Sequence, residues 1–277
     1  MQGRKFPQFY SPNAAPTSRL DQTRLCCCYY HFPTVFHWVS RMNGLLVRVG
    51  ADLSVGGGSW NGPVNSETSE FTYVAIPEIK PLHAGMEKPY RALESTLARF
   101  RTRLPAHLEL RHMHLDPDFQ HLTYGDQGQR AIQLRSNLHP GDLVVFYAGL
   151  KDIHRTTELV YAIIGLFVVN GFVLATDVPA QDRDINAHSR RILEPGVNDL
   201  IVRGRAGESG RLKRCLSIGE YRDRAYRVRR DLLDTWGGLS VKDGYLQRSA
   251  RLPRFLDPQR FLRWLEKQSP TLMQANN

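Results

Sequence analysis

Two apolar segments in the middle of the chain constrain its fold more than any other feature. Residues 142–150 read DLVVFYAGL and residues 158–169 read ELVYAIIGLFVV. Both are rich in β-branched and aromatic residues, which favour strands, and both are shorter than the roughly 20 apolar residues of a membrane-spanning helix. Asn170-Gly171 interrupts the second apolar run and is typical of a hairpin turn. We therefore expect two buried strands in a soluble protein without a membrane partner.

The flanking segments alternate between strand and helix patterns. Apolar or alternating runs predict further strands over residues 44–50, 70–78, 107–115 and 199–204. Helix-like patterns cover residues 90–104, 128–138 and 257–268. The last of these opens with Asp257 and Pro258, a typical helix start. This mixture predicts an α+β fold, built on a mixed, strongly curved sheet or partial barrel with peripheral helices.

The first 41 residues differ from the rest of the chain. They have no clear period of 2 or 3.6 residues, and they contain three of the four cysteines in one run, Cys26–Cys28. The C-x-x-C spacing of many metal sites is absent. We expect translation to start at Met42, which would make residues 1–41 a misassigned upstream extension; an organellar transit peptide is the alternative. Residues 42–277 then form a single domain, and its one cysteine, Cys215, suits a reducing cytoplasm.

The chain is basic, with many of its arginines in the C-terminal part. It has 37 Lys and Arg against 27 Asp and Glu, a formal net charge of +10. Basic side chains neutralise phosphates and release counterions, so the excess favours polyanionic partners. We expect the partner to be a nucleotide or nucleic acid, DNA rather than RNA. The sequence identifies no cofactor and leaves the oligomeric state open.

The densest polar cluster is HMHLDPDFQHLTYGD, residues 112–126. On an extended strand, His112, His114 and Asp116 would project to one face, and Asp118 would follow in a turn. Imidazole and carboxylate groups can share acid and base roles or bind a divalent metal; alternatively, the two aspartates stabilise an Asp-Pro turn. We place His114, Asp116 and Asp118 among the candidate catalytic residues and assign no metal site.

Tyr124 and Asp126 end this cluster and could bring a phenol and a carboxylate to the same cavity mouth. Asp126 could accept a hydrogen bond from a base edge, or it could cap the helix predicted to follow. We take Tyr124 as a candidate base-binding residue and Asp126 as a candidate catalytic residue.

A second polar motif, DRDINAHSRR, contains Asn186, His188, Arg190 and Arg191. An amide can pair with a base, an imidazole can exchange a proton near neutral pH, and guanidinium groups can hold phosphate. Residues two apart diverge on a helix, so Asn186 and His188 can share a site only if this segment is extended or a turn. The alternative is a solvated helix face. We count His188 as catalytic and the other three as nucleotide-binding candidates.

The strand pair at the centre of the chain resembles part of the PUA-like domains, which include the EVE and YTH relatives. The resemblance covers about thirty residues, from Gly141-Asp142 through the second apolar strand. Those families hold a modified base in an aromatic-lined pocket, which would make Tyr147 a candidate wall that stacks on a base. The alternative is that Phe146 and Tyr147 are ordinary core aromatics.

A longer set of motifs resembles the nucleotide modification-associated domain family, third type. The motifs are VRVGAD, GPV, YVAIPE, HLDPDF, YGD, GDLVVFYAGL, NAH and DLIVRG. Membership implies a role in systems that make or handle modified bases, without implying a particular reaction. The leader and the Arg-rich C-terminal part depart from the family pattern.

Three functions of different classes follow. A base-recognition module would have an aromatic pocket with a basic rim, and we rank it first. A nucleotide- or DNA-modifying enzyme would bring His114, Asp118, Asp126 and His188 together in a cleft, although G-x-S-x-G, H-E-x-x-H and zinc-deaminase motifs are missing. A protein-interaction scaffold would lack such a pocket. Whether the chain is an enzyme stays open, but we expect HLDPDF, YGD, FYAGL and NAH to converge on one pocket.

Overall fold

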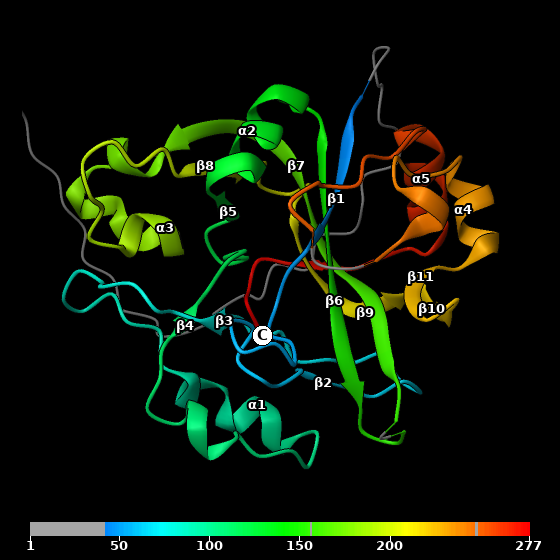
Figure 1. Ribbon diagram of the computed structural model, residues 1–277, viewed down its shortest axis with the longest axis horizontal. Helices are drawn as coiled ribbons and strands as arrows, with labels where there is room; N and C mark the ends of the chain where they lie inside the picture. Colours follow the sequence, from blue (N-terminus) through cyan, green and yellow to red (C-terminus); the bar gives the residue numbers. More distant parts are fainter. Residues whose placement is uncertain (1–41, 156, 247–248) are drawn as a thin grey trace, which may run out of the picture.

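The computed structural model describes residues 42–155, 157–246 and 249–277 (Figure 1). The expectations for residues 1–41, including the cysteine run, lie outside these residues, and the single domain from Met42 stays a prediction. No helix in the described part of the chain has the length and apolar character needed to cross a membrane.

The two central apolar segments are strands, as predicted, and the structure pairs them antiparallel. They are β6 (Leu143–Asp152) and β7 (Leu159–Leu174), and they run through the middle of the molecule (Figure 1). On the outer edge of β6, β1 (Gly44–Arg48) and then β2 (Pro63–Val64) pair with it in parallel. The sheet is therefore mixed.

The other edge of β7 is shared by two strands that follow one another along it. They are β8 (Leu200–Gly204) and β9 (Gly210–Ser217), both antiparallel to β7. β5 (Thr123–Asp126) adds to β8, and β12 (Leu272–Met273) adds to β9. The eight-stranded sheet thus branches at β7, and its described strands form no closed barrel. The α+β class and the mixed sheet are confirmed, whereas the PUA-like resemblance stays a prediction.

Side-chain alternation along β6 separates two cores, one on each face of the sheet. Val144, Phe146 and Ala148 belong to one buried cluster, and Val145 and Tyr147 belong to the other. This follows from the two-residue period of a strand, which sends neighbours to opposite faces. Both faces are covered, so both sets of side chains are apolar.

Different helices cover the two faces (Figure 1). Residues of α1 (Glu94–Ala98) and α2 (Gly128–Asn137) join the core that contains Phe146. Residues of α4 (Arg230–Trp236) and α5 (Pro258–Lys267) join the core that contains Tyr147. The remaining elements are β3 (Ile76–Pro77), β4 (Met113–His114), α3 (Ala187–Arg190), β10 (Gly219–Arg222), β11 (Ala225–Val228) and the 3₁₀ helices η1 (Tyr90–Leu93), η2 (Ala106–Leu108), η3 (Ala175–Asp177), η4 (Ala180–Ile185) and η5 (Lys242–Gly244).

Several predicted elements form as expected. The helix predicted over residues 128–138 is α2, and the strand over residues 199–204 is β8. The start of α5 is also confirmed, because Asp257 Oδ1 accepts a hydrogen bond from the Arg260 amide at 3.0 Å. In each case the local pattern and the tertiary environment favour the same structure.

The predicted hairpin at Asn170-Gly171 is wrong. β7 continues through both residues, and its pairing with β8 shifts register between Val169 and Gly171. A bulge there takes up the extra residue of β7, so the Asn-Gly pair does not turn the chain.

Two other segments also differ from their expected structure. The polar segment after β8 is more regular than expected, since it contains β9. The predicted helix over residues 90–104 is only a short 3₁₀ turn followed by α1, and its α-helical part ends at Ala98.

The predicted strands over residues 70–78 and 107–115 are mostly irregular, leaving only β3 and β4. Tyr73 shows why. Its amide donates to Asn277 Oδ1 at 2.8 Å, and its carbonyl accepts from Asn277 Nδ2 at 2.9 Å. A side-chain amide from the end of the described chain therefore takes the place that a neighbouring strand would occupy.

Candidate active site

A polar cavity of about 270 Å³ lies where the ends of several short strands meet α3. Its walls come from β1, β3, β4, β5, α3 and the first turn of α2. The cavity brings together His114, Asp116, Tyr124, Asp126 and His188. Three of the four motifs expected to converge, HLDPDF, YGD and NAH, therefore do so.

β4 positions His114 beside a buried carboxylate. His114 Nδ1 lies 2.6 Å from Glu78 Oε2 and 3.0 Å from Arg191 Nη2. Arg191 Nη2 also donates to Glu78 Oε1 at 3.0 Å, and because an ionised carboxylate only accepts hydrogen bonds, the shorter contact to Glu78 makes His114 Nδ1 the donor. Nε2 then carries the lone pair. Burial lowers the pKa of His114 to about 4, although the hydrogen bond to Glu78 opposes this shift. The imidazole is therefore neutral at neutral pH, with Nε2 able to accept a proton or bind a ligand.

His188 repeats this arrangement from α3. Its Nδ1 lies 2.5 Å from Asp199 Oδ2, and its Nε2 lies 3.9 Å from Asp116 Oδ2. The rings of His188 and His114 meet edge to face, with their centroids 5.0 Å apart. Burial alone would raise the pKa of Asp199, but the hydrogen bond with His188 and the nearby Arg191 and Lys80 outweigh it, and the pKa is lowered. Asp199 is thus held as a carboxylate that orients the ring.

Asp116 completes the central group. Its Oδ1 accepts hydrogen bonds from the Gly125 amide at 2.8 Å and from Asn186 Nδ2 at 2.9 Å. These contacts fix the carboxylate and leave Oδ2 on the side of His188. Burial raises the pKa of Asp116 to about 6, partly offset by the nearby His188. His114, Asp116 and His188 therefore form one cluster.

Asn186 links this cluster to the start of α3. It is the N-cap residue, with extended backbone, and its Oδ1 accepts a hydrogen bond from the His188 amide at 2.9 Å. Its Nδ2 donates to Asp116 and to Thr123 Oγ1. Residues two apart on a helix point in different directions. The cap residue lies outside the helix, however, and so Asn186 and His188 share a site. Asn186 thus supports the site and is fully buried.

Gly125 allows α3 to approach β5 closely enough to form the site. A Cβ atom at this position would lie 2.3 Å from His188 Cδ2 and 2.7 Å from Asn186 Oδ1. Real Cβ atoms essentially never show contacts under 3.0 Å, so a neighbouring atom would have to shift. The glycine of the YGD motif is therefore required sterically, since any side chain would displace His188.

Tyr124 and Asp126 form a second, adjoining network with Arg130. The Tyr124 hydroxyl donates to Asp126 Oδ2 at 2.5 Å, and Arg130 Nη2 donates to the same hydroxyl at 2.8 Å. Arg130 Nε also lies 2.8 Å from Asp126 Oδ2. Asp126 does not cap α2, whose N-cap residue is Gln127. Tyr124 is buried and packs edge-on against Phe146, so its ring face is not an open platform for a base.

Asp118 and Arg190 are buried outside the cavity. Arg190 Nη2 lies 2.5 Å from Asp118 Oδ2, and its Nε lies 2.9 Å from Asp184 Oδ1. Asp118 Oδ1 also accepts hydrogen bonds from the amides of Gln120 and His121, as expected for the predicted turn. Both groups are occupied by structural contacts. The structure therefore does not bring Asp118 to the cluster or Arg190 to a phosphate site at the cavity.

Tyr147 does not join the cavity either. It is 1% exposed and belongs to the core on the opposite face of the sheet, where its ring lies 6.3 Å from that of Tyr161. Its neighbour Phe146 is the aromatic that points toward the cavity side, packing against Tyr124. The convergence expected for the FYAGL motif is therefore wrong, because the strand period sends Tyr147 to the other face.

Cations surround the central cluster. Arg48, Lys80, Arg111, Arg130 and Arg191 all line the cavity. Three of them pair with carboxylates, namely Arg48 with Asp52, Arg130 with Asp126 and Arg191 with Glu78. Among the described residues, the other two, Lys80 and Arg111, form no ion pair. The cavity mouth therefore has positive charge to offer an anion.

Two exposed apolar side chains also line the cavity. Val55 is 90% exposed and Ile79 is 79% exposed. Val55 begins the Gly-rich segment VGGG, residues 55–58. This segment folds back on Asp52 through a hydrogen bond from the Asp52 amide to the Gly57 carbonyl at 2.9 Å. Exposed apolar groups beside a cavity are typical of ligand-binding surfaces.

A larger cavity of about 590 Å³ has a different character. Trp60, Phe100, Arg99, Lys151 and His154 line it. His154 Nε2 is 3.9 Å from Glu67, whose side chain is 75% exposed. In the part of the chain that the structure describes, only His114, Asp116 and His188 bring three potential metal-ligating groups together. The smaller cavity is therefore the better candidate for chemistry.

The sequence interpretation missed several of the residues that build this site. Glu78 and Asp199 orient the two histidines, and Gly125 makes room for one of them. All three lie within motifs noted in the sequence, YVAIPE, DLIVRG and YGD. Their position at strand ends was the available signal, because strand-end loops commonly carry functional groups.

Comparison with protein families accounts for the set of motifs. The family described as nucleotide modification associated domain 3 has a model that matches residues 43–259. The searches of curated proteins and of solved structures find no match. The matched region includes every residue of the cavity and most of the chain. The chain therefore belongs to the nucleotide modification associated domain 3 family.

Proposed function

We propose that this protein is an enzyme that modifies a nucleotide or a nucleic-acid base, and that His114, Asp116 and His188 form its reaction centre. One observation carries the proposal: two imidazoles, each oriented by its own buried carboxylate, meet a third carboxylate inside a cavity. Burying this many ionisable groups is costly, and such clusters concentrate at functional sites. Family membership supports a nucleotide-related substrate.

The cavity mouth matches the two parts of a nucleotide. Lys80 and Arg111 offer charge to a phosphate, since neither forms an ion pair with a described carboxylate. Val55 and Ile79 offer apolar surface to a base. His114, Asp116 and His188 would then lie beneath the bound group and exchange protons with it or hold a reactant.

The geometry favours catalysis over base recognition alone. A recognition module needs an aromatic surface on which a base stacks, but Tyr147 faces the opposite core and Tyr124 is packed edge-on. The cavity instead concentrates groups that transfer protons or bind ions. Base binding remains part of the proposal, as the step that positions the substrate.

A double substitution at the cavity mouth tests the nucleotide site. Lys80→Ala combined with Arg111→Ala is expected to raise the Kd for nucleotides or single-stranded DNA or RNA by about 100-fold or more, because each of the two charged contacts contributes about 1.5–3 kcal/mol and about 1.4 kcal/mol is a factor of ten. Fluorescence anisotropy with labelled oligonucleotides and calorimetry with free nucleotides measure it. Binding should also weaken as salt rises.

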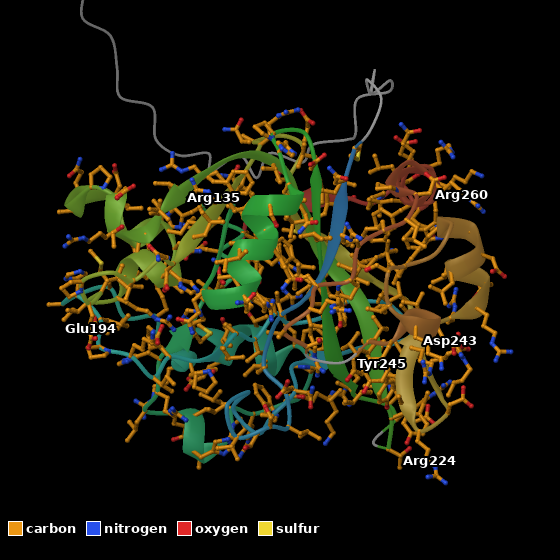
Figure 2. All side chains as sticks on the ribbon, turned by 45° about the horizontal axis from the view of Figure 1, so that its top comes forward. Arg135, Glu194, Arg224, Asp243, Tyr245 and Arg260 are labelled. Carbon is orange, nitrogen blue, oxygen red and sulfur yellow. The ribbon has the colours of Figure 1, made fainter. Side chains whose placement is uncertain are left out.

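A matched control separates the cavity from overall charge. Arg135→Ala combined with Lys267→Ala removes the same charge from α2 and α5, and both side chains are exposed (Arg135 is labelled in Figure 2). This variant should bind like the wild type. An equal loss of affinity in both double variants would show that binding depends on net charge and not on this cavity.

Nucleoside analysis of cells tests catalysis. Cells that express the wild-type protein should accumulate a nucleoside of altered mass in digested DNA, RNA or the free nucleotide pool. Asp116→Asn should abolish this product while nucleotide binding in vitro persists, since the amide keeps the shape of Asp116 but loses its charge. Liquid chromatography with mass spectrometry measures the product. Unchanged product from the Asp116→Asn variant would contradict the proposed reaction centre.

A further inference from the structure

We propose that His114 Nε2, Asp116 Oδ2 and His188 Nε2 bind a divalent transition-metal ion in this cavity, which deepens the proposed function and rests on it. The three side chains each offer one ligand atom, and these atoms all lie within 4.8 Å of one another. Two histidines and one carboxylate are a ligand set that binds Fe²⁺, Mn²⁺ or Zn²⁺ and leaves positions open for water and substrate.

The residues around the three ligands hold them as metal ligands are usually held. Each histidine donates its Nδ1 proton to a carboxylate, at 2.6 Å to Glu78 and at 2.5 Å to Asp199, so that Nε2 is the nitrogen with a lone pair. Carboxylates that support metal-binding histidines in this way fix the tautomer and make the imidazole a better donor. A single such pair can be incidental, but here both histidines have one.

Hydrogen bonds also hold the carboxylate of Asp116 in place. Its Oδ1 is taken by the Gly125 amide and by Asn186 Nδ2, which leaves Oδ2 as the oxygen nearest to His188. The distance from Asp116 Oδ2 to His188 Nε2 is 3.9 Å. Bonds of about 2.1 Å to a common ion place neighbouring ligands roughly 3.0–3.4 Å apart. Because the ligand atoms lie up to 4.8 Å apart, the side chains need to draw together by roughly 0.5–1.8 Å when an ion binds.

The charge of the cluster also favours a bound cation. Glu78, Asp116 and Asp199 contribute three carboxylates, and within the described ranges Arg191 is the one guanidinium that pairs with them, at 3.0 Å from Glu78 and 3.9 Å from Asp199. Protonating both histidines would balance this charge only by placing two cationic rings 5.0 Å apart beside Arg191. A divalent ion between the rings balances it without that repulsion.

The ligand types decide the class of ion. Mg²⁺ and Ca²⁺ prefer oxygen ligands throughout, whereas two imidazoles select first-row transition metals. An ion bound here would act as a Lewis acid on a phosphate or base oxygen, or would lower the pKa of a bound water. Lys80 and Arg111 at the cavity mouth would help to hold an anionic substrate toward it.

Titration of the metal-free full chain tests the site. Cys26, Cys27 and Cys28 are first replaced by serine, so that their thiols do not bind the ions. Mn²⁺, Co²⁺ and Zn²⁺ should each bind with a stoichiometry of one per chain and compete with one another, and a large excess of Mg²⁺ should not displace them. Calorimetry measures affinity, and visible absorption of Co²⁺ reports imidazole coordination.

Substitutions locate the ion. His188→Ala and Asp116→Asn should each weaken binding by about 100-fold or more, and Asp199→Asn should weaken it by about 10–100-fold, as expected for a supporting carboxylate. His139→Ala is the control, because the His139 side chain is 75% exposed and lies outside the cavity. Circular dichroism checks that each variant is folded. If a variant unfolds, NMR spectra of the wild type locate the ion instead. Bound Mn²⁺ should broaden the imidazole signals of His114 and His188 at lower concentration than that of His139.

Two results would overturn the proposal: no stoichiometric uptake by the folded wild type, or uptake that His188→Ala leaves unchanged. Nucleotide binding is measured in parallel on the metal-free protein. Binding of nucleotide without uptake of ions would reject the metal site and leave the proposed function intact. Uptake of one ion by the three residues without any nucleotide binding would support the metal site and count against the proposed nucleotide function.

Discussion

Gly125→Ala is expected to reduce the yield of modified nucleoside by about 100-fold while the protein stays folded. The added Cβ would lie 2.3 Å from His188 Cδ2 and 2.7 Å from Asn186 Oδ1, so α3 must move away from β5. A displacement of about 1 Å at a reacting group can cost about 100-fold in rate. The same movement lengthens the contacts of both residues with Asp116.

The experiment measures modified nucleoside in cells that express each variant. Imidazole signals in NMR spectra give a second readout that needs no activity, and the signal of His188 should shift while that of His139 stays in place. Gly171→Ala is the matched control, because a Cβ at Gly171 meets no atom within 4 Å. Normal activity of Gly125→Ala, with an unmoved His188 signal, would contradict the steric role of this glycine.

Asp118→Asn is expected to lower the free energy of unfolding by about 3–5 kcal/mol, the usual cost of removing one partner of a buried ion pair. Arg190 is 1% exposed, and its guanidinium would lose its buried partner. Its other carboxylate partner, Asp184, has a side chain that is 48% exposed and does not replace that contact. Urea unfolding measures the change. Asp184→Asn is the control and should cost about 1 kcal/mol or less.

The ionisation of Asp118 adds a pH dependence to this prediction. Burial raises its pKa, but the hydrogen bond with His121 and the charge of Arg190 outweigh it, and the pKa falls to about 2. A carboxyl whose pKa is lower in the folded state stabilises the fold above its unfolded pKa of about 4, and that contribution is lost as pH falls toward 2. The wild type should therefore lose stability over this range, and Asp118→Asn should lose less. Full stability of Asp118→Asn with loss of activity would instead support the catalytic role first considered for Asp118.

Local sequence patterns were sufficient for the elements that are apolar along their whole length or whose ends carry their own signals. The central strands β6 and β7, the helix α2 and the capped start of α5 all follow from apolar patterns and capping residues. The strand predicted over residues 70–78 is wrong at its centre because the backbone of Tyr73 bonds to the side chain of Asn277, which lies about two hundred positions away in the sequence. No local pattern contains that information.

Tyr147 shows a second limit of sequence reasoning. An apolar strand that is covered on both faces has no polar side, so its pattern does not tell which residues face which core. The one-residue difference between Phe146 and Tyr147 decides whether a ring lies beside the cavity or on the far face of the sheet. Only the packing of α2 on one face and of α4 and α5 on the other determines this.

Residue types and their position where strands give way to turns were enough to indicate which side chains could carry chemistry. His114, Asp116, Asn186 and His188 were identified in this way, and they do converge. Their roles depend on contacts made by folding, because Glu78 is 36 positions from His114 and Asp199 is 11 positions from His188. Taken alone, each of these carboxylates is an ordinary acidic residue. Burial next to an imidazole, which depends on how the strands and α3 pack, makes them the groups that orient the site.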